Sequence, residues 1–520
     1  MQIQNIVVLM LENRSFDHLL GSLNKLSPTV AGLTGAEFNY NDPRNTQSAK
    51  TLVTPSDQFV TPYCIPFDPA HEFTDVQMQL YGPRPGGAPN QPSAPNDPTP
   101  DPAAAPMNGF MHSATTAAAA AGDSFSGDPQ QVMEYFQPDQ VPVLTALARS
   151  FALFNWWFSS LPGPTWPNRY FIHAATSGGL TDSPCTMQEA ESGLGFGFSF
   201  AAGTIYDRIR AAGRQWRIYH DGLPQSPSIA SLWPEFINPF TKNFREMGNF
   251  QADMEAQALP DYTFIEPNYD VSGNYLNGNS MHPLNDIRNG ELLVKQVYET
   301  LRTSPYYWPR ILLIVTFDEH GGFYDHIPPP GATPTSDDSR YSNPAHSFRF
   351  DRLGVRVPGI LVSAYTKPGT VIDTDAQGGR YVVDHTSALA TVEKLFSLQP
   401  LTLRDKAANT LDVALNVPDA SDDAPTSLPD PQAPPVEQLA APRQQLPAAV
   451  ADTAPVSQNQ RSFLALAHAC NLQLSAPAEH PSLKARYATI RRQKEAADYI
   501  HEVERKIRLR RKPDTGIHAP

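Results

Sequence analysis

Two segments of the chain carry unbroken apolar runs that end abruptly in polar residues. The first, IVVLML, is followed directly by Glu12 and Asn13, and the second, ILLIVTF, is followed by Asp318 and Glu319. Runs of this length without polar alternation are typical of strands that are buried on both faces of a parallel sheet. We therefore expect an α/β architecture in which two strands deliver these four polar side chains to one edge of the sheet.

Capping and turn residues predict a helix after each of two loops. Ser15 can cap a helix that begins with FDHLL. In GPTWPNRYFIHAATSGG, Pro167 fits the first turn of a helix that Gly178 or Gly179 can end. Thr165 is then expected just before a helix N-terminus, where free backbone N–H groups favour an alkoxide or a bound phosphate. An ordinary N-cap is the alternative role for this threonine.

Two proline-rich segments interrupt this pattern. Residues 83–106 hold nine prolines and almost no large apolar residue, which predicts a long surface loop inserted in the first domain. Residues 418–455 hold nine more, which predicts an extended interdomain linker. The expected organisation is a catalytic domain at 1–417, a linker at 418–458 and a helical region at 459–520.

The C-terminal region contains the most basic part of the chain. Between Ser482 and Lys512, apolar residues recur at helical spacing, and eleven Lys or Arg outnumber four Asp or Glu. Two interpretations are open for this basic amphipathic helix. It either docks on the acidic body of the same protein or approaches an anionic membrane surface.

Composition excludes some classes of function. The net charge of -14 argues against nucleic-acid binding by the chain as a whole. Cys64, Cys185 and Cys470 are too few and too far apart for a disulfide framework or a zinc spacing. No apolar run reaches the roughly 18 residues that a membrane span needs. No signal peptide is recognised, so we expect a cytoplasmic protein from the chain as given, or a secreted or periplasmic one if a leader was removed.

The polar residues after the two strands predict a metal site. Three carboxylates at one sheet edge would repel one another strongly unless a cation neutralises them. Oxygen ligands from Glu, Asp and Asn suit magnesium, calcium or manganese better than zinc. The alternative is that each acidic pair only caps the helix or turn that follows it. A metal beside Thr165 would also lower the pKa of its hydroxyl and make it a usable nucleophile.

Several motifs together resemble a known family. ENRSFDH, GPTWPNR, MHPLND and FDEHGGFYDH occur in an order similar to that of the phosphoesterase family, which contains the non-specific phospholipases C of bacteria and plants and related bacterial acid phosphatases. The resemblance implies an alkaline phosphatase-like α/β/α sandwich with a mostly parallel central sheet. It also implies a divalent metal at the strand ends.

The resemblance assigns roles to individual residues. It implies that Glu12, Asn13, Asp318 and Glu319 bind the metal and that Thr165 is a metal-bound nucleophile that forms a phosphothreonine.

Further roles follow from the same motifs. Asn168 would hold a phosphoryl oxygen. His282 matches an active-site histidine, and His71, His385 and His220 match other histidine positions of the family. A histidine must protonate the leaving alkoxide, and His282 or His71 is the preferred donor.

The predicted function is that of a phospholipase C, a phosphoric diester hydrolase that releases diacylglycerol and a phosphorylated head group. Threonine at position 165 resembles the phospholipase branch of the family rather than the acid phosphatase branch. A broad-specificity acid phosphatase is the alternative enzyme, and a membrane-surface binding protein with an inactive site is the second alternative. The expected partner is a phospholipid or phosphate ester, with peripheral membrane contact as a further option.

Overall fold

The two apolar runs form the central pair of an eight-stranded sheet. In the computed structural model, β1 (Asn5–Leu11) and β10 (Ile311–Phe317) are parallel, and Leu11 pairs with Phe317 at their carboxyl ends. Every side chain of β10 and all but Asn5 of β1 are at most 1% exposed. This register brings the polar residues that follow both strands to the same edge, as the sequence predicts.

The sheet has the strand order β12-β6-β11-β10-β1-β9-β7-β8. Its six other strands are β6 (Ala152–Phe154), β7 (Trp216–His220), β8 (Phe244–Glu246), β9 (Tyr262–Ile265), β11 (Gly359–Val362) and β12 (Thr370–Ile372). β11 pairs antiparallel with both of its neighbours, and all the other pairs are parallel. The prediction of a mostly parallel central sheet is confirmed.

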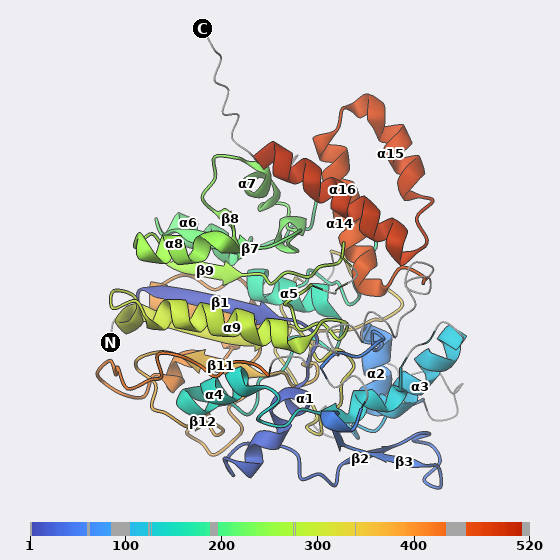
Figure 1. The fold of residues 1–520 in the computed structure, drawn as a ribbon, viewed down its shortest axis with the longest axis vertical. Helices are drawn as coiled ribbons and strands as arrows, with labels where there is room; N and C mark the ends of the chain where they lie inside the picture. The colour runs from blue at the N-terminus through green and yellow to red at the C-terminus, as the bar shows by residue number, and fades with distance from the viewer. Residues whose placement is uncertain are drawn as a thin grey trace.

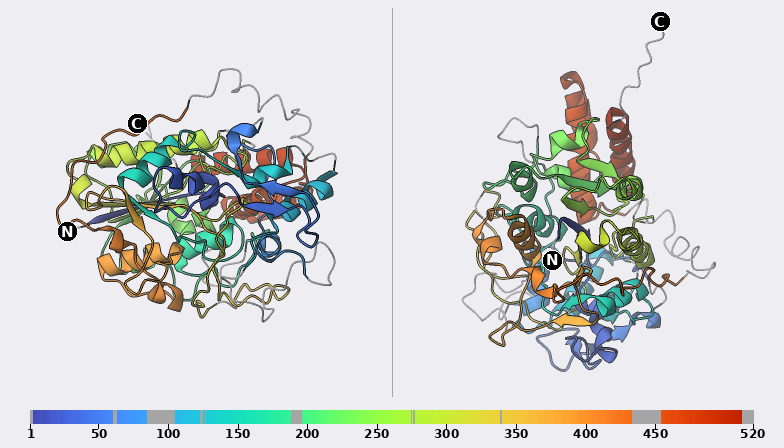
Figure 2. Two further views of the ribbon diagram at one scale, coloured as in Figure 1. Left: turned by 90° about the horizontal axis from the view of Figure 1, so that it is seen from below. Right: turned by 90° about the vertical axis from the view of Figure 1, so that its left-hand side faces the viewer.

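Helices cover both faces of the sheet (Figures 1 and 2). One face carries α4 (Pro142–Ser150), α8 (Phe250–Glu255) and α9 (Ile287–Arg302), and the other carries α5 (Thr165–Ala174), α6 (Ile205–Ala211) and α10 (His385–Phe396). The layers therefore form the expected α/β/α sandwich. The structure describes residues 3–59, 63–84, 105–122, 125, 127–187, 196–273, 275, 277–337, 340–432 and 454–511.

Short elements complete the body of the protein. Its other helices are α1 (Phe16–Leu20), α2 (Phe73–Tyr81), α3 (Phe110–Ala121), α7 (Trp233–Ile237) and α11 (Leu403–Ala407). Two small sheets pair β2 (Phe38–Tyr40) with β3 (Lys50–Leu52) and β4 (Thr54–Pro55) with β5 (Glu134–Tyr135). Ser15 caps α1 as predicted, because its Oγ accepts the N–H of His18 at 3.1 Å. Most of the predicted insertion at 83–106 lies outside the described residues.

The C-terminal region consists of α14 (Gln458–Leu474), α15 (His480–Tyr487) and α16 (Gln493–Arg511). The basic segment is therefore two helices with a break between them, whereas the sequence predicts one. Apolar residues of α14 and α16 belong to the same buried core as β1, so one face of α16 packs on the body of the protein. The membrane interpretation of its exposed face stays open. α15 has no buried residue.

The segment that precedes α14 is only partly described. Residues 433–453 lie outside the described part, whereas residues up to 432 run along α9. There Arg302 donates to the carbonyl oxygen of Ala424, and Leu428 is buried. The domain boundary near 417 stays a prediction. None of the described helices is long and apolar enough to cross a membrane.

Candidate active site

The end of β1 bends sharply at Asn13. This residue has a φ of 58°, in the left-handed region that asparagine tolerates better than most residues. Its backbone N–H donates to Oδ1 of Asp318 at 2.9 Å, which ties the ends of β1 and β10 together. Its side-chain Nδ2 lies 3.3 Å from Oγ1 of Thr165 and donates to Oε1 of Glu319. One asparagine thus connects both strand ends to the start of α5.

The end of β10 is held by backbone donors and one arginine. Oδ1 of Asp318 also accepts the N–H of Glu319 at 2.7 Å, and its Oδ2 accepts Nε of Arg169 at 2.9 Å. Oε2 of Glu319 accepts the N–H of Gly321 at 2.7 Å, within a turn where that glycine has a φ of 63°. A Cβ at Gly321 would lie 2.2 Å from the carbonyl oxygen of Asn13, so this turn needs glycine.

Thr165 is the first residue of α5 and is almost fully buried. The preceding loop is shaped by Asn168, whose Nδ2 donates to the carbonyl oxygens of Leu161, Gly163 and Pro164, while its Oδ1 accepts the N–H of Leu161. In this structure the side chain of Asn168 is engaged by the loop, and its role in holding a phosphoryl oxygen stays a prediction. These contacts position Thr165.

The site gathers three buried carboxylates against the guanidinium of Arg169 and the imidazole of His71. Glu12, Asp318 and Glu319 are each 0% exposed, and Arg169 forms an ion pair with Asp318 alone among them. Burial, opposed by Arg169 and reinforced by the two glutamates, raises the pKa of Asp318 to about 7. Burial also raises the pKa of Glu12, whose Oε2 has no hydrogen-bond partner.

These donors fit a divalent cation. A buried carboxylate oxygen without a partner is costly unless a cation balances it, and all the converging donors are hard oxygen or amide groups. The three carboxylates do not all lie within 4.8 Å of one another. The amide Nδ2 of Asn13 stands among Glu319 Oε1, Thr165 Oγ1 and His71 Nε2, so a partial positive charge occupies the point where they converge.

A second acidic group lies behind the site. Ligand atoms of Asp17, Asp325 and His326 lie within 4.8 Å of one another. Arg356 is fully buried against them, with Nη2 2.8 Å from Asp17 Oδ1 and Nε 3.1 Å from Asp325 Oδ2. The arginine already neutralises this pair, so the group ties the segments after β1 and β10 to the segment before β11.

Two histidines flank one aspartate beside the site. His71 Nε2 lies 3.2 Å from Asn13 Nδ2 and 3.8 Å from Glu319 Oε1. Burial alone would lower the pKa of His71, but the charges of Glu319 and Asp68 outweigh it and raise the pKa to about 10. His282 stacks on Tyr275 and places Nε2 3.4 Å from Asp68 Oδ1, while His71 Nδ1 is 4.0 Å from the same oxygen.

His385 supports the site by a contact with the backbone of Asp318. Its Nε2 donates to the carbonyl oxygen of Asp318 at 2.6 Å, and its Nδ1 accepts the indole N–H of Trp157 at 3.4 Å. Both ring nitrogens are therefore used, and burial lowers the pKa of this imidazole to about 4. A neutral ring held in this way orients Asp318 and is not available as a proton donor.

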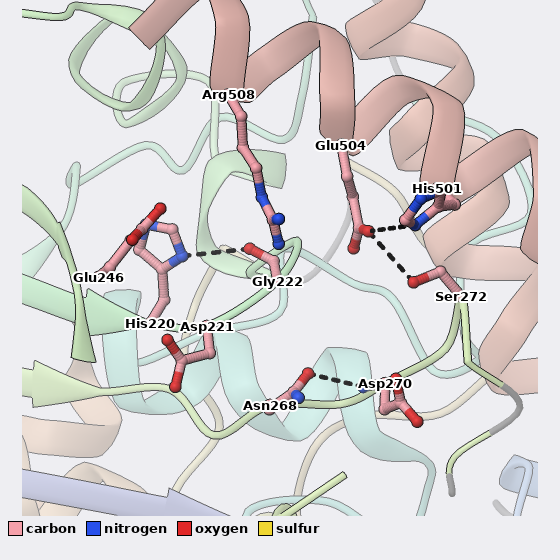
Figure 3. Close-up of a pocket in the computed structure, with 10 residues that line it drawn as sticks. All are labelled: His220, Asp221, Gly222, Glu246, Asn268, Asp270, Ser272, His501, Glu504 and Arg508. Atoms are coloured by element: carbon pink, nitrogen blue, oxygen red, sulfur yellow. Dashed lines mark hydrogen bonds and ion pairs between the residues drawn. The ribbon is translucent and has the colours of Figure 1, made fainter. Parts of the chain in front are cut away.

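His220 lies elsewhere. It lines a separate pocket of about 340 Å³ at the carboxyl ends of β7, β8 and β9, under α16 (Figure 3). Its Nδ1 faces the carbonyl oxygen of Gly222 at 3.2 Å, and its Nε2 accepts Nη1 of Arg511 at 3.0 Å. Burial and this arginine lower its pKa to about 3. The prediction that His220 belongs to the catalytic group is wrong, because its ring secures α16.

The structure adds residues that the sequence analysis did not single out. Arg169 stacks over Tyr269 and also donates to the carbonyl oxygens of Met10 and Leu11, so it joins α5 to both strands. It lies within GPTWPNR, next to Asn168. Asp68 lies within DPAHEF. The motif pattern contained both residues, but their roles depend on contacts between distant segments.

The first turns of α14 contact the site from the side. Asn459 is 2% exposed, and its Nδ2 lies 3.5 Å from Oε1 of Glu12, while its Oδ1 has no hydrogen-bond partner. Phe463 packs edge to face on Trp166, the neighbour of Thr165, at 5.2 Å between ring centroids. Ser457 Oγ lies 3.4 Å from the hydroxyl of Tyr275, which stacks on His282. No spacing in the sequence predicts these contacts.

Comparisons with known proteins identify the family of this chain. Residues 3–399 match the phosphoesterase family. Non-specific phospholipase C6 of Arabidopsis thaliana is 38% identical over 82% of this chain and 75% of its own length. Non-hemolytic phospholipase C of Burkholderia pseudomallei is 26% identical over 76% of this chain and 55% of its own length. A solved structure of an alkaline phosphatase superfamily protein from Vibrio parahaemolyticus covers 51% of this chain and 64% of its own, with 13% identity and a TM-score of 0.30.

Proposed function

Because the chain belongs to the phosphoesterase family, we propose that it is a phospholipase C that cleaves the glycerol-side phosphodiester bond of phospholipids. The products are diacylglycerol and a phosphorylated head group. The observation that carries this proposal is the placement of Thr165 Oγ1 at the start of α5, 3.3 Å from Asn13 Nδ2 and beside buried carboxylates of both central strands.

Glu12, Asn13, Asp318 and Glu319, together with Thr165, would hold a divalent cation, and magnesium, calcium or manganese suits their oxygen donors better than zinc does. When bound, this cation would lower the pKa of the threonine hydroxyl and offset the negative charge of the phosphate. Arg169 and His385 keep Asp318 in place from opposite sides.

The chain's own groups account for the two chemical steps. The Thr165 hydroxyl gives its proton to water, its Oγ1 attacks phosphorus, the bond from phosphorus to the glycerol oxygen breaks, and the leaving oxygen takes a proton. The backbone N–H groups of Thr165 and Trp166, at the start of α5, have no acceptor within the helix and would face the phosphoryl oxygens. The proton comes from the pair His71 and His282, whose imidazole rings both face Asp68. The same group then removes a proton from the water that releases Thr165.

Thr165→Ala tests this proposal. We expect kcat for phosphatidylcholine to fall about 1000-fold or more, because no other described hydroxyl occupies the start of α5. Thr165→Ser should keep activity within about tenfold, since it retains the hydroxyl. Thr145→Ala removes another buried threonine hydroxyl, on α4, and should leave the rate unchanged.

The measurements compare hydrolysis of a soluble short-chain phosphatidylcholine with hydrolysis of a phosphate monoester, with and without chelator. Unchanged activity in Thr165→Ala would remove the proposed nucleophile. A strong preference for the monoester would instead indicate an acid phosphatase.

A further inference from the structure

The two most exposed large apolar side chains among the described residues belong to neighbouring parts of the surface. Phe240 is 80% exposed and lies in the loop between α7 and β8, and Leu509 is 61% exposed and lies near the end of α16. Single exposed apolar residues are common on soluble proteins. Two at the same end of the fold, on different elements, are candidates for one interaction surface (Figure 1).

Arg511 places these two residues at the same end of the molecule. Its Nη2 donates to the carbonyl oxygen of Phe244 at 2.9 Å, and its guanidinium lies 5.0 Å from the ring centroid of Phe236. Those two residues bracket the loop that carries Phe240. Figure 1 shows α7, β8 and the end of α16 together at this end of the fold.

Cations accompany the two apolar residues on the same loop and on the same part of α16. Lys242 shares the loop of Phe240, Arg505 lies one helical turn before Leu509 on the same face of α16, and Arg510 follows it. All three are exposed, and none has an ion pair with another described residue. By contrast, Arg486 of α15 is paired with Glu502 at 2.6 Å. We call Phe240, Lys242, Arg505, Leu509 and Arg510 the Phe240–Leu509 patch.

We propose that the Phe240–Leu509 patch docks on an anionic lipid surface. Unpaired cations are attracted to acidic head groups, and a phenylalanine and a leucine among them can enter the boundary between head groups and acyl chains. The net charge of the whole chain is -14, so this patch is a local exception suited to such a surface. The inference rests on the proposed function, because a phospholipase C finds its substrate in a bilayer.

Vesicle sedimentation tests the docking. The protein carries Thr165→Ala so that the vesicles stay intact, and it is mixed with phosphatidylcholine vesicles with or without 30 mol% phosphatidylglycerol. We expect binding to the anionic vesicles that weakens at high salt, because the Debye length shortens. Lys242→Gln, Arg505→Gln and Arg510→Gln combined should weaken binding at least about tenfold. Phe240→Ser with Leu509→Ser should also weaken it.

The matched control is Leu26→Ser with Leu52→Ser, because both leucines are 52% exposed and belong to parts of the fold far from α16 (Figure 1). This variant should bind vesicles like the parent protein. Equal binding by the patch variants and the parent would overturn the proposal, and so would no binding by the parent. Salt-sensitive retention on heparin without vesicle binding would also overturn it, in favour of a soluble polyanion.

Failure of the docking is distinguishable from failure of the proposed function. With Thr165 restored, the patch variants should hydrolyse a short-chain phosphatidylcholine below its micellar concentration at the rate of the wild type. They should be slower only on anionic vesicles. An enzyme that hydrolyses neither substrate refutes the proposed function, whereas one that cleaves both at the wild-type rate despite the patch substitutions refutes the docking.

Discussion

At the scale of single residues, buried charge determines what each side chain can do. Glu12, Asn13, Asp318 and Glu319 were predictable because they follow unbroken apolar runs, and the sheet edge brings them together. The role of Asn168 was not predictable, because its carbonyl partners belong to a loop whose path no pattern reveals. A histidine in a motif is equally ambiguous from sequence, since His385 and His71 differ only in their partners.

Glu393 predicts a pH dependence of stability away from the site. It lies on α10, and burial together with the charge of Asp405 raises its pKa to about 9. The unfolded chain loses this proton at an ordinary carboxyl pKa. The stability that the protonated side chain contributes is therefore complete below about pH 4.5 and is lost progressively as the pH rises toward 9.

Glu393→Gln should remove that loss, because the amide stays neutral and can still donate to Asp405. Urea unfolding should give the variant a free energy of unfolding within about 1 kcal/mol of the wild type at pH 5 and an advantage that grows to as much as about 5 kcal/mol at pH 8.5. Glu479→Gln, at an exposed position, serves as the control. A difference in free energy of unfolding between the variant and the wild type that does not grow with pH would contradict the raised pKa of Glu393.

At the scale of elements, sequence patterns predicted those features that depend on neighbouring residues, such as strand ends and helix caps. β10 begins and ends with the apolar run ILLIVTF, and Ser15 caps α1, as predicted. The contact between Asn459 and Glu12 joins residues 447 positions apart, so no spacing rule could find it. The break between α15 and α16 was also missed, because apolar residues continue at helical spacing across it.

Because α14 supports the site through Asn459, we expect Asn459→Leu to weaken binding of the divalent cation. The substitution keeps the volume but removes the amide beside Glu12, and loss of such supporting contacts typically costs 10- to 100-fold in metal affinity. Competition titration of the metal-free protein against a chelating dye measures this directly. Asn471→Leu is the matched control, because Asn471 is buried on the same helix but contacts Tyr499. Equal affinity in both variants would contradict the support role.

At the scale of the whole molecule, the charges at the sheet edge couple folding to metal. The buried carboxylates repel one another less when a cation is present, so chelation should lower Tm by a few degrees. Differential scanning fluorimetry with and without chelator measures the shift. Asp318→Asn should abolish it, whereas Asp325→Asn should leave it in place. If the Tm shift is instead lost in Asp325→Asn and kept in Asp318→Asn, the cation binds at the group of Asp17, Asp325 and His326.

The bend at Asn13 limits which amino acids can follow the first strand. A φ of 58° strains most side chains and suits glycine, asparagine and aspartate. Asparagine and aspartate, two of these three, carry a side-chain oxygen that can bind a metal ion. The backbone conformation therefore already favours amino acids that can serve as metal ligands at this position. A residue substituted for Asn13 must therefore tolerate the positive φ before its side chain could contribute to the site.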